Sequence, residues 1–405
     1  MNILFVSDVS IKDVIGGAER VLYEQTSRLA KKGFKIFVIT RMLPLHTSHY
    51  ELINNVHEFR YRIFRRNSLS FIVSSIKNSR KIFIELMKAN SVDLINFHQP
   101  FSALGTILTS KSRHMAKVYT CLSLAFEEYE TRRSKPPKIF SKINYWVNSY
   151  LRKHIEKYII RKSDSVIVLS EFTRNSLVGN YGINPEKIHV IPGGVDLRKF
   201  GYNVNKRAIK NQLGLAEDKI ILFTVRNLVP RMGLENLIYA MKKIVASTED
   251  IFLIIGGEGE LRPTLSRLIS ELKLGDFVQL KGFIPEEELP SYYQAADFFI
   301  LPTKYLEGFG LVTIEAMACG TPVLGTPVGG TEEILKIFDP SFLFEDTKSE
   351  AMAKLIVDKV KYYEDKPAEY QKLSQRCRAF VEKCYSWEEH VNKIEALFVQ
   401  STKEK

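Results

Sequence analysis

The sequence predicts an α/β protein with two doubly wound, Rossmann-like domains that face a central cleft. In both halves of the 405-residue chain, short apolar runs alternate with helical patterns, which indicates parallel sheets covered by helices on both faces. A stretch rich in proline and glycine at 191–196, followed by polar residues to 206, separates the halves. Glycine loops follow several apolar runs, and open sheets of this kind bind ligands beyond the carboxyl ends of their strands.

The first domain is predicted to comprise residues 1–200, beginning with a buried strand at 3–6. Its other candidate elements are strands at 35–40, 94–97, 116–120 and 165–169 and helices at 18–32 and 71–88. The second domain, residues 201–385, repeats the alternation with strands at 220–225, 252–256, 277–281, 298–301 and 321–325. An amphipathic pattern from Ser386 to about Gln400 predicts a last helix within a C-terminal segment, residues 386–405.

The composition indicates a soluble globular protein, with 45% apolar and 26% charged residues. No apolar run approaches the roughly 20 residues that span a bilayer, and the apolar run at the N-terminus is too short for a signal peptide. The four cysteines show no C-x-x-C or other metal-binding spacing, so we interpret them as structural thiols of a reducing compartment. We therefore expect a cytoplasmic protein.

Basic charge is concentrated in the first half. The first 200 residues hold 32 lysines and arginines against 16 acidic residues, whereas the other 205 hold 26 against 30. Two stretches, 60–81 and 132–162, interleave basic with large apolar residues, a pattern suited to an anionic membrane surface. A solvated basic face on ordinary packed helices explains the same pattern. No recognised nucleic-acid-binding motif accompanies the charge, so a nucleic acid partner is not expected.

The most informative segment is Glu307-Gly-Phe-Gly-Leu-Val-Thr-Ile-Glu315. It places one carboxylate in a glycine-rich loop and the other in the helix that the loop opens, predicted at 310–318. The first N–H groups of a helix lack partners and favour an anion, while Glu315 could accept hydrogen bonds from a ribose. A helix would separate the two carboxylates by roughly 12 Å, beyond the roughly 5–10 Å of a glycosidase pair. We therefore expect a nucleotide-sugar site rather than a hydrolase site.

With Ala-Met-Ala-Cys-Gly-Thr-Pro-Val after it, this E-x7-E segment resembles glycosyltransferase family 4, whose members are retaining enzymes of the GT-B fold. The resemblance runs from Gly16-Gly-Ala-Glu-Arg20 to Trp387. It implies that residues 1–200 form the acceptor-side domain and residues 201–385 the nucleotide-sugar-binding domain. It also implies that the last helix crosses back to the first domain.

The resemblance implies roles for single residues of the second domain. Glu307 would hold hydroxyls of the donor sugar, and Glu315 would hold the ribose hydroxyls. The N–H groups that follow Phe309, at Gly310 and Leu311, would stabilise the donor diphosphate.

In the first domain, the resemblance implies that the loop at Gly16 and Gly17 meets the diphosphate and the acceptor. Paired glycines let a backbone approach a ligand closely. His98, within Asn96-Phe-His-Gln-Pro100, would contact the donor sugar, although a lone histidine is more often structural.

The segment Arg226-Asn-Leu-Val-Pro-Arg231-Met-Gly233 departs from the family pattern. The family has an arginine and a lysine here that neutralise the donor diphosphate, and in the tightest register Asn227 and Met232 occupy their positions. We expect Arg226 and Arg231, each displaced by one residue, to take over, because a guanidinium binds phosphate oxygens bidentately. With such cations no metal is expected to be required, and no D-x-D triplet occurs in the chain.

The sequence thus predicts a metal-independent retaining glycosyltransferase that uses a nucleoside diphosphate sugar and a hydroxyl acceptor. The basic first half favours a lipid-linked or cell-envelope acceptor at the cytoplasmic membrane face. Two alternatives remain open. Nucleotide-sugar 2-epimerases share the fold and act on the donor alone, and Asn227 with Met232 would suit a nucleotide-sugar-binding subunit that has lost catalysis.

Overall fold

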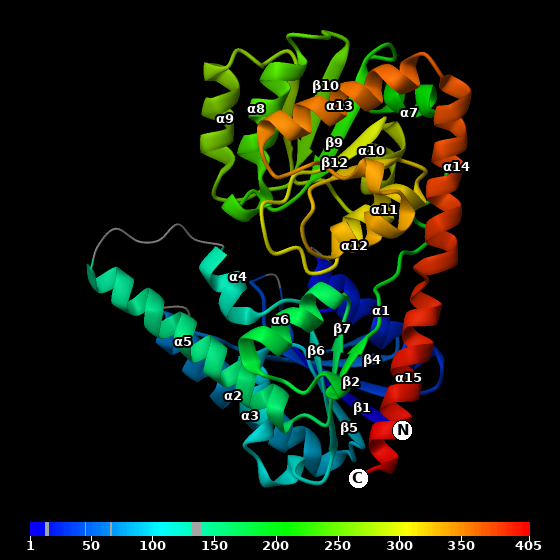
Figure 1. Ribbon diagram of the computed structural model, residues 1–405. Helices are drawn as coiled ribbons and strands as arrows, with labels where there is room; N and C mark the ends of the chain where they lie inside the picture. The colour runs from blue at the N-terminus through cyan, green and yellow to red at the C-terminus, as the bar shows by residue number, and fades with distance from the viewer. Residues whose placement is uncertain (13–15, 45, 65–66, 132–138, 204) are drawn as a thin grey trace. The chain divides into compact units, whose positions relative to one another are not determined.

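The structure, a computed structural model, describes residues 1–12, 16–44, 46–64, 67–131, 139–203 and 205–405, with the backbone alone at 139–142. The chain divides into two compact units. Unit 1 comprises Met1–Glu130, Ser134–Gly193 and Trp387–Lys405, and unit 2 is mainly Gly194–Ser386. Each unit is a sheet with helices on both of its faces (Figure 1), which confirms the predicted α/β class with two Rossmann-like domains.

Unit 1 contains a sheet with eight strands among the described residues, in the order β3-β4-β2-β1-β5-β6-β7-β8. The strands are β1 Asn2–Val6, β2 Lys35–Arg41, β3 Tyr50–Ile53, β4 Val56–Tyr61, β5 Leu94–Phe97, β6 Ala116–Cys121, β7 Ser165–Val168 and β8 Ile188–Val190. Its helices are α1 Gly17–Lys31, α2 Ser68–Ala89, α3 Pro100–Ile107, α4 Ala125–Thr131, α5 Ile139–Lys162, α6 Glu171–Tyr181 and α15 Trp387–Lys403. Two short 3-10 turns occur at Ser110–Ser112 and Pro185–Lys187.

The prediction of a parallel sheet needs one correction in unit 1. Strand β3 pairs with β4 in the antiparallel direction, whereas the other strand pairs among the described residues of this sheet are parallel. This β3–β4 hairpin was not predicted from the sequence, because charged residues interrupt its apolar pattern. Two of those residues, Glu58 and Arg60, are fully buried.

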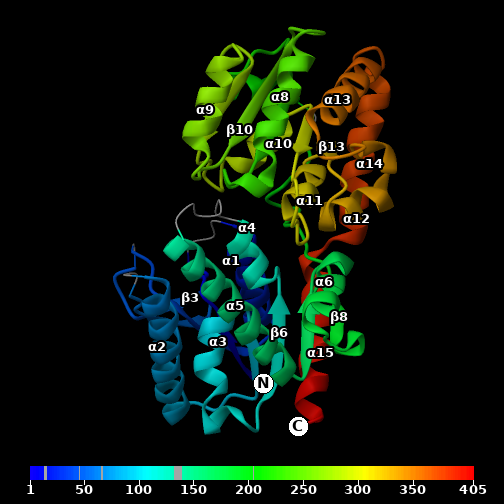
Figure 2. The same cartoon turned by 60° about the vertical axis from the view of Figure 1, so that its left-hand side comes forward.

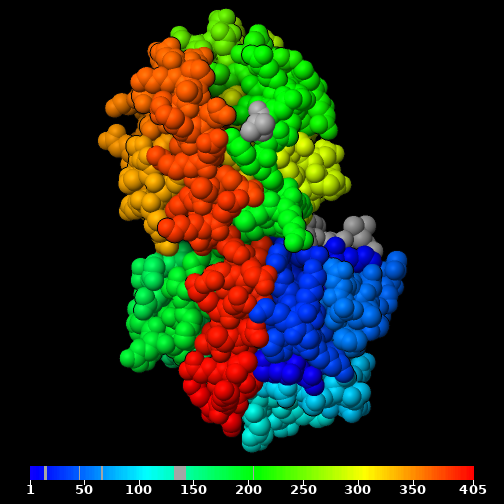
Figure 3. Space-filling view, turned by 90° about the vertical axis from the view of Figure 1, so that its right-hand side faces the viewer, coloured from blue at the N-terminus to red at the C-terminus, as the bar shows by residue number. Residues whose placement is uncertain are grey.

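The two faces of the unit 1 sheet have separate apolar cores. Residues of α2, α3, α5 and α6 pack on one face, where Phe83, Ala103 and Ile160 belong to one cluster with Val6. The other face packs against α1 and α15, with Leu22 of α1 in the same cluster as several α15 residues. Figure 3 shows α15, in red, lying on the surface beside the blue N-terminal part of the chain, and Lys32 and Glu395 form an ion pair there.

Unit 2 contains a parallel sheet with five strands among the described residues, in the order β11-β10-β9-β12-β13. The strands are β9 Ile220–Val225, β10 Ile251–Gly256, β11 Val278–Gly282, β12 Phe298–Leu301 and β13 Val323–Gly325. The helices are α7 Lys206–Gln212, α8 Leu234–Ile244, α9 Arg262–Glu271, α10 Leu289–Ala295, α11 Leu311–Ala318, α12 Gly329–Phe338, α13 Ser349–Glu364 and α14 Pro367–Cys384. Two 3-10 turns lie at Pro230–Met232 and Pro340–Phe342.

No helix among the described residues has the length and apolar content needed to cross a bilayer.

Candidate functional site

The main group of predicted site residues lies at the carboxyl ends of two neighbouring strands of unit 2. Strands β9 and β12 are parallel, with Leu222 opposite Phe298 and Phe223 opposite Phe299. Arg226 directly follows β9, and Thr303 and Glu307 lie in the loop that follows β12. Because parallel neighbours end at the same edge of a sheet, residues separated by about 80 positions in sequence come into contact here.

Arg226 and Glu307 form a nearly buried ion pair. The guanidinium Nη2 contacts Glu307 Oε2, and the two side chains are 7% and 10% exposed. Thr303 Oγ1 donates a hydrogen bond to the same carboxylate oxygen at 3.1 Å. The structure therefore brings a cation suited to a phosphate next to a carboxylate suited to sugar hydroxyls, and the two neutralise each other.

Met232, which stands where the resemblance implies a lysine, packs against the guanidinium of Arg226. Its sulfur lies 3.3 Å from Nε and 3.0 Å from Nη2 of Arg226, and the residue is buried. A thioether is a weak acceptor and a polarisable contact. Asn227, by contrast, is exposed. The displacement by one residue thus places Arg226, rather than Asn227, against the carboxylate.

Arg231 has a different environment from Arg226. It lies in the 3-10 turn Pro230–Met232, and its Nη1 donates to the carbonyl oxygen of Leu306 at 2.6 Å. Leu306 has a φ of 63°, which is unusual for a residue other than glycine. In turn, Lys304 N donates to Arg231 O at 2.8 Å. Arg231 therefore stabilises the backbone of the loop that carries Glu307.

Two glycines at the start of α12 shape the same loop. Gly330 N donates to Glu307 O at 2.9 Å. A Cβ on Gly329, whose φ is 61°, would lie 2.0 Å from Glu307 O, and a Cβ on Gly330 would lie 2.4 Å from Phe309 Cα. Since real Cβ atoms do not approach so closely, only glycines let the start of α12 pack against residues 307–309.

Helix α11 begins where the sequence predicts a helix N-terminus. Gly310 is its N-cap with a φ of 87°, Leu311 is its first residue, and no side chain caps it. Phe309, just before it, is 7% exposed. The first N–H groups of this helix can therefore bind an anion. Glu307 precedes the helix, so the separation estimated for a continuous helix does not describe the two carboxylates.

Glu315 has a different hydrogen-bond partner from the Arg226–Glu307 pair. It is 5% exposed, and its Oε2 accepts a hydrogen bond from the Tyr293 hydroxyl of α10 at 3.1 Å. The buried Cys319 lies about one helical turn further along the chain. Burial raises the pKa of its thiol, and the nearby Glu315 carboxylate raises that pKa further. The role of Glu315 toward a ribose stays a prediction.

The remaining predicted residues belong to unit 1. Gly16 and Gly17 are exposed, and Gly16 is the extended N-cap of α1 with no side-chain cap bond. Residues 13–15 of the same loop lie outside the described part of the chain.

His98 follows β5 and packs against Phe5, with ring centroids 5.8 Å apart. It is 5% exposed, and neither ring nitrogen has a hydrogen-bond partner among the described residues. Burial lowers the pKa of His98 to about 3, so the ring is neutral at physiological pH. In a neutral ring one nitrogen can donate a hydrogen bond to a hydroxyl and the other can accept one from it.

Sequence reasoning missed Thr303, which lies two residues after β12 and contacts both Arg226 and Glu307. The available signal was a hydroxyl residue directly beyond the carboxyl end of a buried strand. Among the described residues, no group of three or more His, Cys, Asp or Glu side chains could hold a metal ion.

Two family models together match most of the chain. The model described as Glycosyltransferase Family 4 matches residues 15–199, and the model described as Glycosyl transferases group 1 matches residues 205–380. The matched ranges contain all the predicted site residues.

Curated relatives and solved structures agree with these matches. The chain is 25% identical over 407 residues to the UDP-Gal:alpha-D-GlcNAc-diphosphoundecaprenol alpha-1,3-galactosyltransferase of Escherichia coli, covering 97% of this chain and 96% of the relative. It is 34% identical over 178 residues to a GDP-mannose-dependent alpha-(1-6)-phosphatidylinositol monomannoside mannosyltransferase of Mycolicibacterium smegmatis, covering 42% and 46%. Sucrose-phosphate synthase from Thermosynechococcus elongatus has the same fold, with a TM-score of 0.79 at 23% identity over the full length of both chains.

Proposed function

Because the chain belongs to glycosyltransferase family 4 and has the GT-B fold, we propose that it is a retaining, metal-independent glycosyltransferase. It moves a sugar from a nucleoside diphosphate sugar to a hydroxyl acceptor. The observation that carries the proposal is the Arg226–Glu307 pair, held beside the uncapped N-terminus of α11 at the carboxyl ends of β9 and β12.

In the proposed reaction the donor separates this ion pair. The donor diphosphate takes Arg226 and the N–H groups of α11, and the donor sugar hydroxyls donate to Glu307. Arg226 thereby exchanges a carboxylate for a phosphate, and Glu307 exchanges the guanidinium for neutral hydroxyl donors, so each keeps hydrogen-bond partners when the donor binds. Arg231 keeps the loop in place through the Leu306 carbonyl.

The bond changes need no protein base. The acceptor oxygen attacks the anomeric carbon on the face from which the diphosphate leaves, while the bond between that carbon and the phosphate oxygen breaks. The proton of the acceptor hydroxyl goes to the leaving phosphate oxygen. The protein contributes electrostatic stabilisation of the departing diphosphate, and His98 contributes a neutral contact to the sugar.

A thermal-shift screen with UDP, GDP, ADP and their common sugar conjugates tests the donor site. We expect a selective rise in melting temperature with one nucleotide, reflecting binding to the folded state. Donor binding without transfer to any acceptor would favour the binding-subunit alternative, and epimerised donor without acceptor would favour a 2-epimerase. No shift with any of these nucleotides would contradict the proposal.

We further propose a lipid-linked or cell-envelope acceptor, reached from the cytoplasmic face of a membrane. The names of the two curated relatives above both specify a lipid-linked acceptor. In unit 1, helix α5 carries a stripe of exposed large side chains at helical spacing, comprising Ile143, Trp146, Val147, Tyr150 and Tyr158, which are 41–62% exposed. Its charged residues among 143–162 are basic except for the buried Glu156. Figure 2 shows α5 beside α3 and α2. Leu69 and Val73 of α2 are also exposed.

Removing aromatic side chains from the α5 stripe should weaken binding to anionic vesicles. We expect Trp146→Ser/Tyr150→Ser to lose at least 10-fold in vesicle partitioning. Two aromatic side chains that insert into the bilayer surface contribute several kcal/mol to binding, at roughly 25 cal/mol per Å² of apolar area buried there. The matched control is Tyr239→Ser/Ile337→Ser, which removes exposed side chains of unit 2. Co-sedimentation at low salt is the measurement, and equal binding of both double variants would exclude α5 as the docking element. The basic residues at 65–66 and 132–138 lie outside the described residues and are not part of this assignment.

A further inference from the structure

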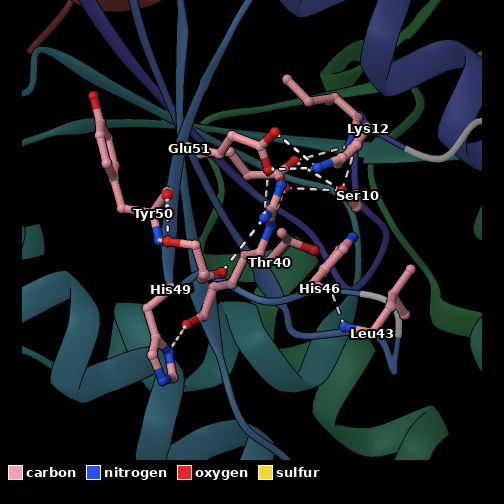
Figure 4. Close-up of polar contacts among 12 residues, drawn as sticks. Ser10, Lys12, Thr40, Leu43, His46, His49, Tyr50 and Glu51 are labelled. Carbon is pink, nitrogen blue, oxygen red and sulfur yellow. Dashed lines mark hydrogen bonds and ion pairs between the residues drawn. The ribbon is translucent and has the colours of Figure 1, made fainter.

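A chain of charged side chains connects the loop after β1 with the β3–β4 hairpin in unit 1 (Figure 4). After β1 ends at Val6, the described part of the loop contains Ser10, Ile11 and Lys12, and α1 begins after its N-cap Gly16. On the hairpin, Glu51 of β3 lies opposite Glu58 of β4. These two carboxylates would repel each other, but Arg60 forms ion pairs with both, at 2.7 Å to Glu51 and 2.6 Å to Glu58.

Glu58 holds the loop through two hydrogen bonds. Its Oε1 accepts from the Ser10 hydroxyl at 2.8 Å, and its Oε2 accepts from the Ile11 N–H at 2.9 Å. Ser10, Glu58 and Arg60 are all 0% exposed. At the exposed end of the chain of contacts, Lys12 Nζ donates to Glu51 at 2.8 Å.

A buried ion pair is a costly way to stabilise a sheet. Glu58 lies on the face of β4 that also carries Val56, which packs in the apolar cluster with α1. Taking two charges out of water costs several kcal/mol each, and a well-packed apolar pair is often as stable or more stable. An apolar pair, however, cannot accept hydrogen bonds from the Ser10 hydroxyl and the Ile11 N–H. The specific contribution of the charged pair is therefore the position of the loop.

We infer that the Glu58–Arg60 pair is a positioning device that holds Ser10 and Ile11 after β1, and that the correct placement of Gly16 and Gly17 at the substrate depends on it. The inference rests on the proposed function, because that function gives the loop a ligand. Glu58 does not touch the substrate in this scheme. It acts through Ser10 and Ile11, which lie six and five residues before Gly16.

Two variants separate positioning from stability. Glu58→Gln keeps an acceptor oxygen but removes the charge that pairs with Arg60. Glu58→Leu/Arg60→Met removes both charges, so that no buried charge remains unpaired and the fold is preserved. We expect both variants to lose roughly 100-fold in kcat, the loss associated with a displacement of about 1 Å. The dissociation constant of the unphosphorylated nucleoside, whose ribose is assigned to Glu315 of unit 2, should stay within 2-fold of the wild-type value.

Hydrogen exchange provides a readout that does not depend on activity. The Ile11 amide should exchange faster in both variants, because its acceptor is weakened or lost. Glu156→Gln is the matched control, since Glu156 is also a buried glutamate of unit 1 and accepts from Tyr119, Tyr181 and the Ala125 N–H at 2.6–2.8 Å. This control should leave Ile11 exchange and kcat unchanged.

The outcomes can be distinguished. A folded double variant with wild-type kcat would overturn the inference, whether or not Ile11 exchange changes. Unchanged Ile11 exchange in the double variant would overturn it as well. If the wild-type protein transferred sugar from no donor, the proposed function would fail, and the exchange measurement alone would then decide whether the pair anchors the loop.

Discussion

Glu307→Gln should lower kcat at saturating donor by roughly 100- to 1000-fold, the loss seen when one preorganised polar contact to a transition state is removed. In the structure the Glu307 carboxylate accepts from Thr303 and pairs with Arg226. Glutamine keeps the size and one acceptor oxygen but removes the charge that orients the donor sugar hydroxyls. Glutamine is preferable to alanine because alanine would leave the nearly buried Arg226 without any partner, at a cost to stability.

The control for Glu307→Gln is Glu332→Gln, which neutralises a partly exposed carboxylate of α12 that pairs with Lys336. Steady-state kinetics with the donor identified by thermal shift measures the effect, and circular dichroism checks the fold. Wild-type turnover in a folded Glu307→Gln variant would refute the role assigned to this residue.

Arg226→Gln should lower kcat/KM for the donor by roughly 10- to 100-fold, because a charge-assisted hydrogen bond contributes roughly 1.5–3 kcal/mol. The effect should be smaller in Arg231→Gln, since Arg231 donates to the Leu306 carbonyl rather than to a carboxylate. That second variant should instead show a lower melting temperature. Arg226→Lys should not restore activity fully, because an ammonium cannot contact two phosphate oxygens in the manner of a guanidinium.

Comparing the two arginine variants also decides a question that the sequence left open. The sequence placed both arginines one residue from the family positions and gave no preference between them. The structure distinguishes them by partner, with Arg226 on Glu307 and Arg231 on the loop backbone. Kinetic losses in the reverse order would mean that Arg231 turns towards the diphosphate when the donor binds.

Apolar runs without buried charges predicted the central strands well. The strands at 94–97, 220–225 and 298–301 have the predicted bounds, and all their residues are apolar or uncharged. The β3–β4 hairpin escaped prediction because Glu51, Glu58 and Arg60 resemble surface residues in sequence. Their charges are compensated only by contacts with one another and with the β1–α1 loop, and such long-range compensation has no local signature.

The site shows the same division between local and long-range information. The glycine-rich loop and the start of α11 follow from local chemistry, and Gly310 is the N-cap within the predicted segment. The contact between Arg226 and Glu307 depends on the order of β9 and β12 in the sheet, which no local pattern specifies. The need for glycine at 329 and 330 likewise depends on the packing of α12 against residues 307–309.

The anomeric configuration of the product shows whether the protein transfers the sugar with retention. The protein would be incubated with the donor that raises its melting temperature, and with a lipid-linked acceptor in vesicles. The proton NMR spectrum of the new glycosidic linkage would then be compared with that of the donor. We expect the same anomeric configuration in donor and product, whereas an inverted linkage would contradict the same-face mechanism proposed for Arg226 and Glu307.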